Sequence, residues 1–157
     1  MNRWIWLLSL LLLCLGVGAV SGAMTAREVQ GWYQTLTRPS FAPPNWVFAP
    51  VWTTLYILMA AAAWLVALTP ASNSRTLALS IFFAQLLLNF LWSLIFFREH
   101  AIGLAMVELI LLWCCIALTA IVFHRFSHPA AWLMLPYLAW VTFAGFLNWG
   151  FLRLNRM

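Results

Sequence analysis

The sequence predicts an all-α membrane protein, a five-transmembrane-helix bundle that forms a single integral membrane domain over residues 1–157. Of the 157 residues, 66% are hydrophobic and 7% are charged, whereas soluble domains carry about 25% charged residues. The apolar residues fall into five runs, each near the length of about 20 residues that crosses a bilayer as a helix. None of these runs alternates in polarity as a strand of a membrane barrel does. So little charge argues against a soluble enzyme, a disordered chain and a nucleic-acid binder.

The first helix is expected over residues 4–24. Arg3 and the apolar run behind it would also suit a cleaved signal peptide, but the run exceeds the roughly 7–15 apolar residues of such a peptide. Gly18 and Gly22 form a pair of small residues one turn apart, a spacing that lets membrane helices approach closely. These observations favour a helix that is retained.

A long first loop is expected over residues 25–45, and long ordered loops are usually functional. Its second half is stiffened by Pro39, Pro43 and Pro44, because proline fixes φ. Residues 26–36 are expected to form a short helix across the mouth of the bundle. Two interpretations stay open here, a rigid interfacial tether with aromatic anchors and a lid over a cavity.

The other four helices are expected over residues 46–68, 76–97, 101–123 and 131–152. The links between them are short, so consecutive helices should be antiparallel neighbours. The chain has eight Arg, three Glu and no Lys or Asp. The arginines stand singly, mostly where apolar runs end, which is typical of topology and headgroup contact rather than of nucleic-acid binding.

The arginines also predict the orientation of the chain. The first loop, the third link and the C-terminus hold Arg27, Arg38, Arg98, Arg153 and Arg156, and the remaining segments hold Arg3, Arg75 and Arg125. By the positive-inside rule the richer side is cytoplasmic. We therefore expect a cytoplasmic C-terminus and a periplasmic N-terminus in a bacterial cell membrane.

Three of the predicted helices carry a stripe of amide, aromatic or small side chains along one face. The members of each stripe are spaced three or four residues apart, so they lie on the same side of the helix. They are Gln85, Asn89 and Trp92 in the third helix; Tyr137, Trp140, Ala144 and Asn148 in the fifth; and Trp52, Tyr56, Met59 and Ala63 in the second.

Tryptophan at a span end is an ordinary interfacial anchor, and amides can simply join helices. That interpretation is weaker for Trp52, Trp92 and Trp140, which lie several residues inside their spans. A cavity lined by these rings and a few amides would suit a flat, largely apolar ligand.

Residues for acid–base or metal chemistry are sparse. Glu108 is a lone carboxylate inside a span, and we expect it to be hydrogen-bonded or protonated rather than a general base. The three histidines lie in links without a metal-binding pattern, and the three cysteines lie within apolar runs. We therefore predict no metal site and no catalytic acid–base set.

Three blocks of the sequence resemble the translocator protein family, whose bacterial members are called tryptophan-rich sensory proteins (TspO) and whose animal members are called peripheral-type benzodiazepine receptors. The first block runs from Trp32 through Arg38-Pro39 and the double proline to Trp52 and Tyr56. The second runs over residues 85–97, and the third over residues 136–148. The blocks occur in the family's order and cover nearly the whole chain.

The resemblance implies a five-helix bundle, often a homodimer, with a cavity beneath the first loop. Family members bind porphyrins such as protoporphyrin IX and haem, and synthetic isoquinoline carboxamides and benzodiazepines; no further cofactor is implied. The family's pocket positions correspond to Trp52, Asn89, Trp92, Trp140, Ala144 and Asn148. With the stripes, the candidate ligand-binding residues are Trp52, Tyr56, Gln85, Asn89, Trp92, Tyr137, Trp140, Ala144 and Asn148.

The chain departs from the family at two places. Animal members bind cholesterol, and Trp149 stands where their proposed cholesterol motif has Tyr. Ser40-Phe41 stands before the double proline, where some bacterial relatives carry Trp. The departures argue against transferring sterol binding, or the loop's contact with porphyrin, to this chain.

We expect a membrane-embedded protein that binds tetrapyrroles and acts as a sensor, carrier or regulator. One alternative is an enzyme that breaks down porphyrin with light and oxygen, for which Trp52 and Trp140 would be the oxidisable indoles. Another is a small transporter, which fits less well because the sequence has no evident inverted repeat.

Overall fold

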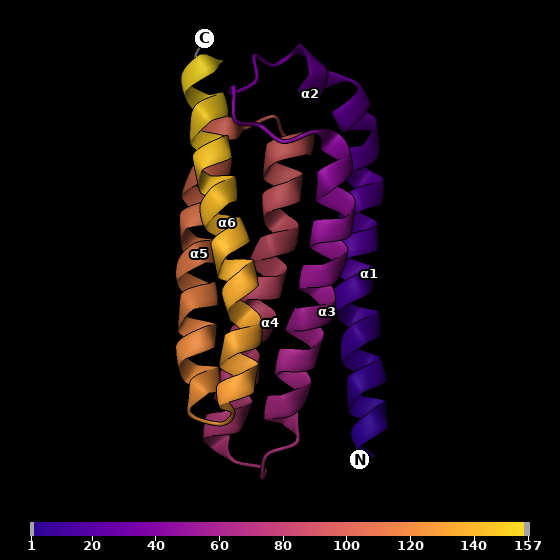
Figure 1. Ribbon diagram of the computed structural model, residues 1–157, viewed down its shortest axis with the longest axis vertical. Helices are drawn as coiled ribbons and strands as arrows, with labels where there is room; N and C mark the ends of the chain where they lie inside the picture. The colour runs from indigo at the N-terminus through magenta and orange to yellow at the C-terminus, as the bar shows by residue number, and fades with distance from the viewer. Residues whose placement is uncertain (1, 156–157) are drawn as a thin grey trace.

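The computed structural model of the chain describes residues 2–155, and this range is built of helices and the turns that connect them. Five helical segments in it are long and apolar enough to cross a membrane. They are α1 (Arg3–Gln30), a short 3-10 turn η1 (Asn45–Val47) with α3 (Phe48–Ala67), α4 (Asn73–Ser93) with the π-helical turn η2 (Leu94–Arg98), α5 (Ile102–His124) and α6 (His128–Leu154). They form an up-and-down bundle (Figure 1), which confirms the predicted fold class.

Several helices begin before the apolar runs that predicted them. The Ser72 hydroxyl accepts a hydrogen bond from the Arg75 amide at 3.1 Å, and α4 begins at residue 73 rather than 76. The Ser127 hydroxyl likewise accepts from the Ala130 amide at 3.3 Å, and α6 begins at residue 128 rather than 131. Such caps satisfy amides that the first turn leaves unpaired. The helices therefore start at the polar caps, not where hydropathy rises.

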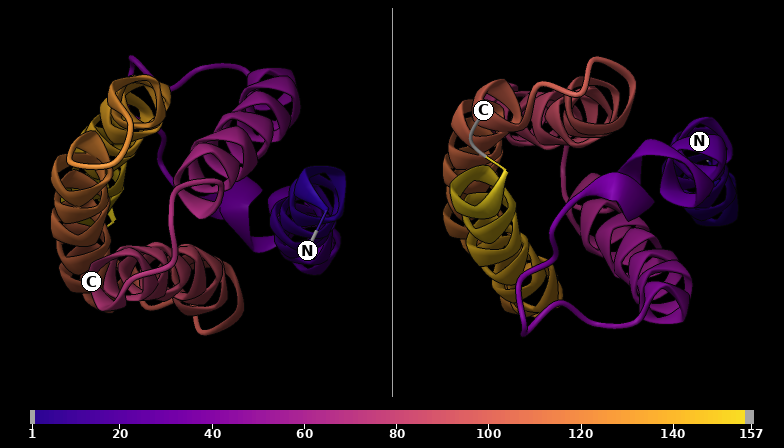
Figure 2. Two further views of the ribbon diagram at one scale, coloured as in Figure 1. Left: turned by 90° about the horizontal axis from the view of Figure 1, so that it is seen from below. Right: turned by 90° about the horizontal axis from the view of Figure 1, so that it is seen from above.

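The first loop is shorter than expected, because α1 continues to Gln30 and ends at Gly31. The short helix expected over residues 26–36 is divided between the last turns of α1 and the separate α2 (Trp32–Thr35). Residues 31–44, called the crossing segment below, then pass over one end of the bundle to reach η1. Figure 2 shows this passage in the view from above.

The end of α4 departs from a regular helix. Residues 94–98 form a π turn in which the Glu99 amide donates to the Leu94 carbonyl at 3.0 Å. His100 follows with a φ of 53°, in the left-handed region that non-glycine residues seldom adopt. Single π turns inside α-helices are rare and often lie at functional sites. This one places Phe96 and Phe97 among the side chains beneath the crossing segment.

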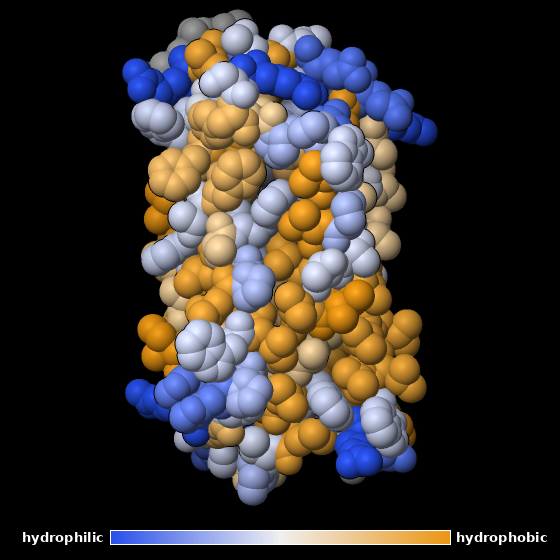
Figure 3. All heavy atoms as spheres, in the orientation of Figure 1, coloured by the Kyte–Doolittle hydropathy of each residue, from blue (hydrophilic) through white to orange (hydrophobic). Residues whose placement is uncertain are grey.

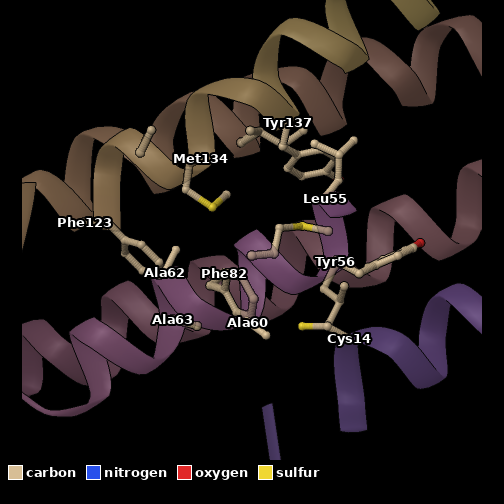
Figure 4. Close-up of a cluster of buried hydrophobic side chains, with 14 of the residues drawn as sticks. Cys14, Leu55, Tyr56, Ala60, Ala62, Ala63, Phe82, Phe123, Met134 and Tyr137 are labelled. Atoms are coloured by element: carbon tan, nitrogen blue, oxygen red, sulfur yellow. The ribbon is translucent and has the colours of Figure 1, made fainter. Parts of the chain in front are cut away.

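The core is packed around α3. Ala60, Ala62 and Ala63 are fully buried, and side chains of other helices pack closely around them, among them Phe82 and Phe123 (Figure 4). These two rings stack with their centroids 5.9 Å apart. Small residues at such contacts let helix backbones approach closely in lipid.

The outer surface has the pattern of an integral membrane protein. Leu12 is 75% exposed and Ile121 and Leu77 are each 61% exposed, although leucine and isoleucine avoid water. In Figure 3 the hydrophilic residues gather at the upper and lower ends and the apolar ones lie between them. Arg27, Arg38, Arg98 and Arg153 lie at the upper end of Figure 1 and Arg3, Arg75 and Arg125 at the lower, while Arg156 lies outside the described residues.

The contact between α1 and α3 depends on Gly18. A Cβ atom at this position would lie 2.5 Å from Cε2 of Tyr56, whereas a Cβ at Gly22 would meet nothing within 4 Å. Of the small-residue pair noted in the sequence, Gly18 is therefore the member at the helix contact. The Tyr56 ring has little freedom to move aside, because its hydroxyl is hydrogen-bonded to Asn89.

We predict that Gly18→Ala lowers the free energy of unfolding by about 1–3 kcal/mol, the usual cost of overpacking. The matched control is Gly16→Ala, because that position is open and alanine is the better helix former by about 1 kcal/mol. Thermal melts of both variants in detergent test the prediction. Equal melting temperatures for the two variants would contradict it.

Candidate functional site

A cavity of about 710 Å³ lies inside the upper half of the bundle, between α1, α3, α4, α5 and α6 and beneath the crossing segment. Sites for small molecules usually enclose roughly 300–1,000 Å³. Seven of the nine candidate residues line it: Trp52, Tyr56, Asn89, Trp92, Trp140, Ala144 and Asn148. The three stripes found in the sequence therefore converge on one space.

The other two candidates, Gln85 and Tyr137, do not line the cavity and are fully buried in the packed core. The Gln85 amide lies 3.9 Å from the Met59 sulfur, which is a weak acceptor. Tyr137 packs edge-on against the Trp52 ring at 6.1 Å. Gln85 and Tyr137 belong to the stripes of α4 and α6, but both stripes continue past the cavity into the packed core.

A buried hydrogen-bond network supports the cavity wall and joins three helices. The Tyr56 hydroxyl of α3 donates to Oδ1 of Asn89 on α4 at 2.6 Å, and Nδ2 of Asn89 donates to the Tyr137 hydroxyl of α6 at 2.9 Å. Asn89 is 3% exposed and Tyr137 is fully buried. Buried polar groups need partners, so this network fixes the relative positions of α3, α4 and α6.

Aromatic rings form much of the wall. Phe48 meets Trp140 edge-on with the centroids 5.9 Å apart, and Trp92 stacks on Phe96 at 5.0 Å. Trp52, Trp92 and Trp140 are all half-buried. Their packing holds the rings in place while part of each surface remains available to a ligand.

The polar atoms of the wall are uncharged. Among the described residues, the side chains that line the cavity include no Arg, Glu or His. Asn148 donates from Nδ2 to the Ile102 carbonyl at 3.0 Å. The Trp92 Nε1 and Asn148 Oδ1 atoms are buried and have no hydrogen-bond partner within the described part of the chain.

The crossing segment closes the upper end of the cavity. Tyr33 lines the cavity and packs against Phe96 and Phe151, and the Arg38 guanidinium lies 4.8 Å from the centre of its ring. Burial raises the pKa of the Tyr33 hydroxyl, and the charge of Arg38 opposes that rise. Tyr33 is the residue of the crossing segment that lines the cavity, and both interpretations of the first loop, tether and lid, stay predictions.

Two contacts fasten the crossing segment to the helices. The Thr37 amide donates to Asn155 Oδ1 at 2.8 Å, and Asn155 Nδ2 returns a bond to the Thr37 carbonyl at 3.0 Å. At the other side Trp32 stacks on His100 at 4.1 Å. His100 Nε2 also lies 3.0 Å from a carboxylate oxygen of Glu28.

The close approach of the crossing segment to α6 also depends on Gly150. A Cβ there would lie 2.6 Å from Pro39 Cγ, so only glycine lets the crossing segment approach α6 this closely. Neither Gly150, Asn155 nor Tyr33 was among the candidate residues. An asparagine after the last apolar run indicates a helix end, but nothing in the sequence connects it to residue 37.

Glu108 lies buried in α5 (Ile102–His124) and was expected to be either hydrogen-bonded or protonated. It is 7% exposed, and neither carboxyl oxygen has a hydrogen-bond partner among the described residues. The expected hydrogen bond is therefore not formed. Ionised carboxylates without a partner are costly inside a bilayer, which favours the neutral acid at this position, the other state expected from the sequence.

We predict that Asn89→Leu destabilises the bundle more than Tyr56→Phe does. Loss of Asn89 leaves two buried hydroxyls without their partner, at about 1–3 kcal/mol for each group, whereas Tyr56→Phe leaves only the Asn89 oxygen unpaired. Thermal melts of the two variants provide the comparison. If Asn89→Leu melted at or above the temperature of Tyr56→Phe, the network would not be a main support of the bundle.

Comparison with known proteins identifies the family of the chain. A sequence model of the TspO/MBR family matches residues 10–154. The chain is similar to the tryptophan-rich protein TspO of Chlorobaculum tepidum, with 41% identity over 157 residues and 99% of each chain covered. It is similar to the translocator protein of Bos taurus, with 39% identity over 85% of this chain and 80% of the relative. With the tryptophan-rich sensory protein of Cereibacter sphaeroides it shares 37% identity over 97% and 92% of the two chains. Together with the five-helix fold, these matches show that the chain belongs to the TspO/MBR family.

Proposed function

We propose that this membrane protein binds porphyrins and similar flat hydrophobic ligands in the cavity and acts as a sensor, carrier or regulator. The observation that carries the proposal is the convergence of Trp52, Trp92 and Trp140 on one cavity. Indole faces stack well on flat conjugated rings. The names of the relatives, one sensory and one a translocator, support the same class of function.

Protoporphyrin IX and haem are the ligands that we propose. Their tetrapyrrole rings suit the aromatic wall, but their carboxylates need a cation or water. Because the lining side chains are uncharged, we place the carboxylates at the upper end, where Arg38 lies over the Tyr33 ring. The ligand would then enter with its apolar edge first.

Breakdown of porphyrin is the second candidate. A photosensitised oxidation needs a bound porphyrin, oxygen and an oxidisable indole, and Trp52 and Trp140 both line the cavity. Titration with protoporphyrin IX in darkness reports binding alone. If the chain also promotes breakdown, the same sample under illumination loses porphyrin absorbance faster than porphyrin in empty micelles. If the chain only binds porphyrin, the absorbance falls no faster than in empty micelles.

We predict that Trp52→Ala and Trp140→Ala each weaken protoporphyrin IX binding about two- to twelvefold, because each removes a stacking contribution of about 0.5–1.5 kcal/mol. Fluorescence quenching in darkness measures the affinity. Trp132→Ala is the matched control, because that ring is 67% exposed at the lower end of α6. Unchanged affinity in both cavity variants would place the porphyrin elsewhere.

We also propose, from the family resemblance, that the chain is a homodimer. We further propose that it lies in a bacterial cell membrane with its upper end on the cytoplasmic side. Of the described arginines, four lie at the upper end and three at the lower: Arg27, Arg38, Arg98 and Arg153 against Arg3, Arg75 and Arg125. The positive-inside rule assigns the richer end to the cytoplasm. The crossing segment would then face the cytoplasm.

We predict that green fluorescent protein fused after residue 157 fluoresces and that alkaline phosphatase at the same position is inactive, because the first requires the cytoplasm and the second the periplasm. Insertion of each reporter into the link at residues 69–72, at the opposite end of the bundle, is the control and should reverse both results. Active phosphatase after residue 157 would reverse the proposed orientation.

A further inference from the structure

Three residues from three elements meet where the crossing segment leaves α1. His100, in the link between α4 and α5, stacks on the Trp32 indole with the ring centroids 4.1 Å apart and an interplanar angle of 16°. Its Nε2 atom lies 3.0 Å from a carboxylate oxygen of Glu28, near the end of α1. These three residues, called the clasp below, join the start of the crossing segment to α1 and to the α4–α5 link.

The backbone of the clasp is strained at His100. Its φ of 53° lies in a region where a Cβ is disfavoured and glycine would be the least costly residue. The Ala101 amide, which donates to the Ile95 carbonyl at 3.1 Å, helps to hold the chain in this conformation. A side chain kept where the backbone suits glycine points to a role for that side chain, and here it makes both contacts of the clasp.

The crossing segment has two fastenings, and they differ in chemistry. At its far end Thr37 and Asn155 exchange hydrogen bonds of 2.8 and 3.0 Å between amide groups, which carry no titratable proton at ordinary pH. At its near end the clasp brings an imidazole to a carboxylate. Imidazole is the side chain that normally changes its charge between about pH 5 and 8. A pH response of the segment should therefore arise at the clasp.

Protonation of His100 strengthens both of its contacts. An imidazolium forms an ion pair with the ionised Glu28 carboxylate, and a cation over an indole face is attracted by the ring. A neutral imidazole can still donate one hydrogen bond from Nε2, but it brings no charge to either partner. The side chains of His100 and Glu28 are 40% and 34% exposed, so water can deliver and remove the proton.

The charges around the clasp are constant over this pH range. Arginine is always protonated and exposed glutamates are ionised above about pH 5, while burial raises the pKa of the Tyr33 hydroxyl, which therefore stays neutral. Among the described residues, Glu28 has the one carboxylate within 4.0 Å of an imidazole nitrogen. The other charged groups of the elements at this end are Arg27 of α1, Arg38 over the Tyr33 ring, the exposed pair Arg98–Glu99, and Arg153 over the Trp149 ring.

We propose that the clasp is a pH-sensitive fastening, which holds the crossing segment against the bundle while His100 is protonated and loosens as the imidazole loses its proton. The stabilisation is present at mildly acidic pH, where Glu28 is still ionised, and it is lost as the pH rises through the titration of the imidazole. This inference goes beyond the proposed function, because it concerns how the segment is held and not what the cavity binds.

Hydrogen–deuterium exchange of the full chain in nanodiscs, without added ligand, measures the fastening. The amides of residues 31–36 are followed by mass spectrometry at about pH 6 and about pH 8.5, on either side of the imidazole titration. Correction for the intrinsic exchange rate at each pH gives a protection factor. In the wild type this factor should fall about two- to tenfold from the lower to the higher pH, as expected for a half-exposed ion pair and a cation–π contact.

Two variants at position 100 separate charge from shape. His100→Arg keeps a planar cation that stacks on an indole and pairs with a carboxylate at every pH, so protection should be equally high at both pH values. His100→Asn tolerates the left-handed backbone but carries no charge, so protection should be equally low at both.

Two further variants are matched controls. Glu99→Gln removes the neighbouring exposed carboxylate and should follow the wild type. Asn155→Ala removes the far fastening, and it should lower protection at both pH values without changing the ratio between them. Thermal melts check that each variant is folded. If His100→Asn does not fold, Glu28→Gln takes its place, because it keeps an acceptor for His100 but not the charge.

Specific results would overturn the inference. Wild-type protection that is constant or rises with pH would exclude a clasp of this sign. A wild-type-like fall in His100→Asn or in His100→Arg would assign the response to another group. Glu108, His124 and His128 are present in every variant, so their titration cannot produce a difference between variants. Since no porphyrin is used, a failed porphyrin titration would refute the proposed function and leave the clasp in place.

Discussion

The amide of Asn89 is hydrogen-bonded through both its oxygen and its nitrogen inside the bundle. Inside lipid no water replaces a missing partner, so this side chain, the Tyr56 hydroxyl and the Tyr137 hydroxyl must satisfy one another. Their bonds hold three helices at fixed positions. The fixed Tyr56 ring in turn requires a glycine on α1, and Tyr137 supports the Trp52 ring edge-on. The shape of the cavity thus follows from the pairing of one amide.

The buried polar groups of the bundle are of two kinds, paired and unpaired. The Asn89 amide and the hydroxyls of Tyr56 and Tyr137 are paired with one another. Other buried polar atoms have no hydrogen-bond partner among the described residues, including Ser21 Oγ, Gln85 Oε1, Trp92 Nε1 and Asn148 Oδ1. The arginines of the described residues lie near the two ends of the molecule, and the buried Glu108 is favoured as the neutral acid. A ligand that lay fully within the wall would meet weak, directional polarity and large aromatic faces, and its ionised groups would have to remain at the upper end near Arg38.

Hydropathy was sufficient to predict five spanning helices, and helical spacing was sufficient to predict which faces of three of them turn inward. The errors had local causes. Residues 25–30 are mostly polar but compatible with a helix, so α1 runs on to the stop at Gly31. Serine caps begin α4 and α6 early. The same spacing could not show where the cavity ends, so Gln85 and Tyr137 were grouped with residues of the wall. The fastening of Thr37 by Asn155 joins positions 118 residues apart, and one sequence carries no signal for such a pair.

That separation along the chain has a consequence for biogenesis. Residue 37 leaves the ribosome long before residue 155, so the first loop is already at the membrane surface while its later partner has yet to be synthesised. Until α6 has been inserted, the loop lacks both Asn155 and the glycine surface at Gly150 that Pro39 rests on. In a nascent chain the cavity therefore lacks the wall that α6 provides, and it is completed only as the final helix enters the bilayer.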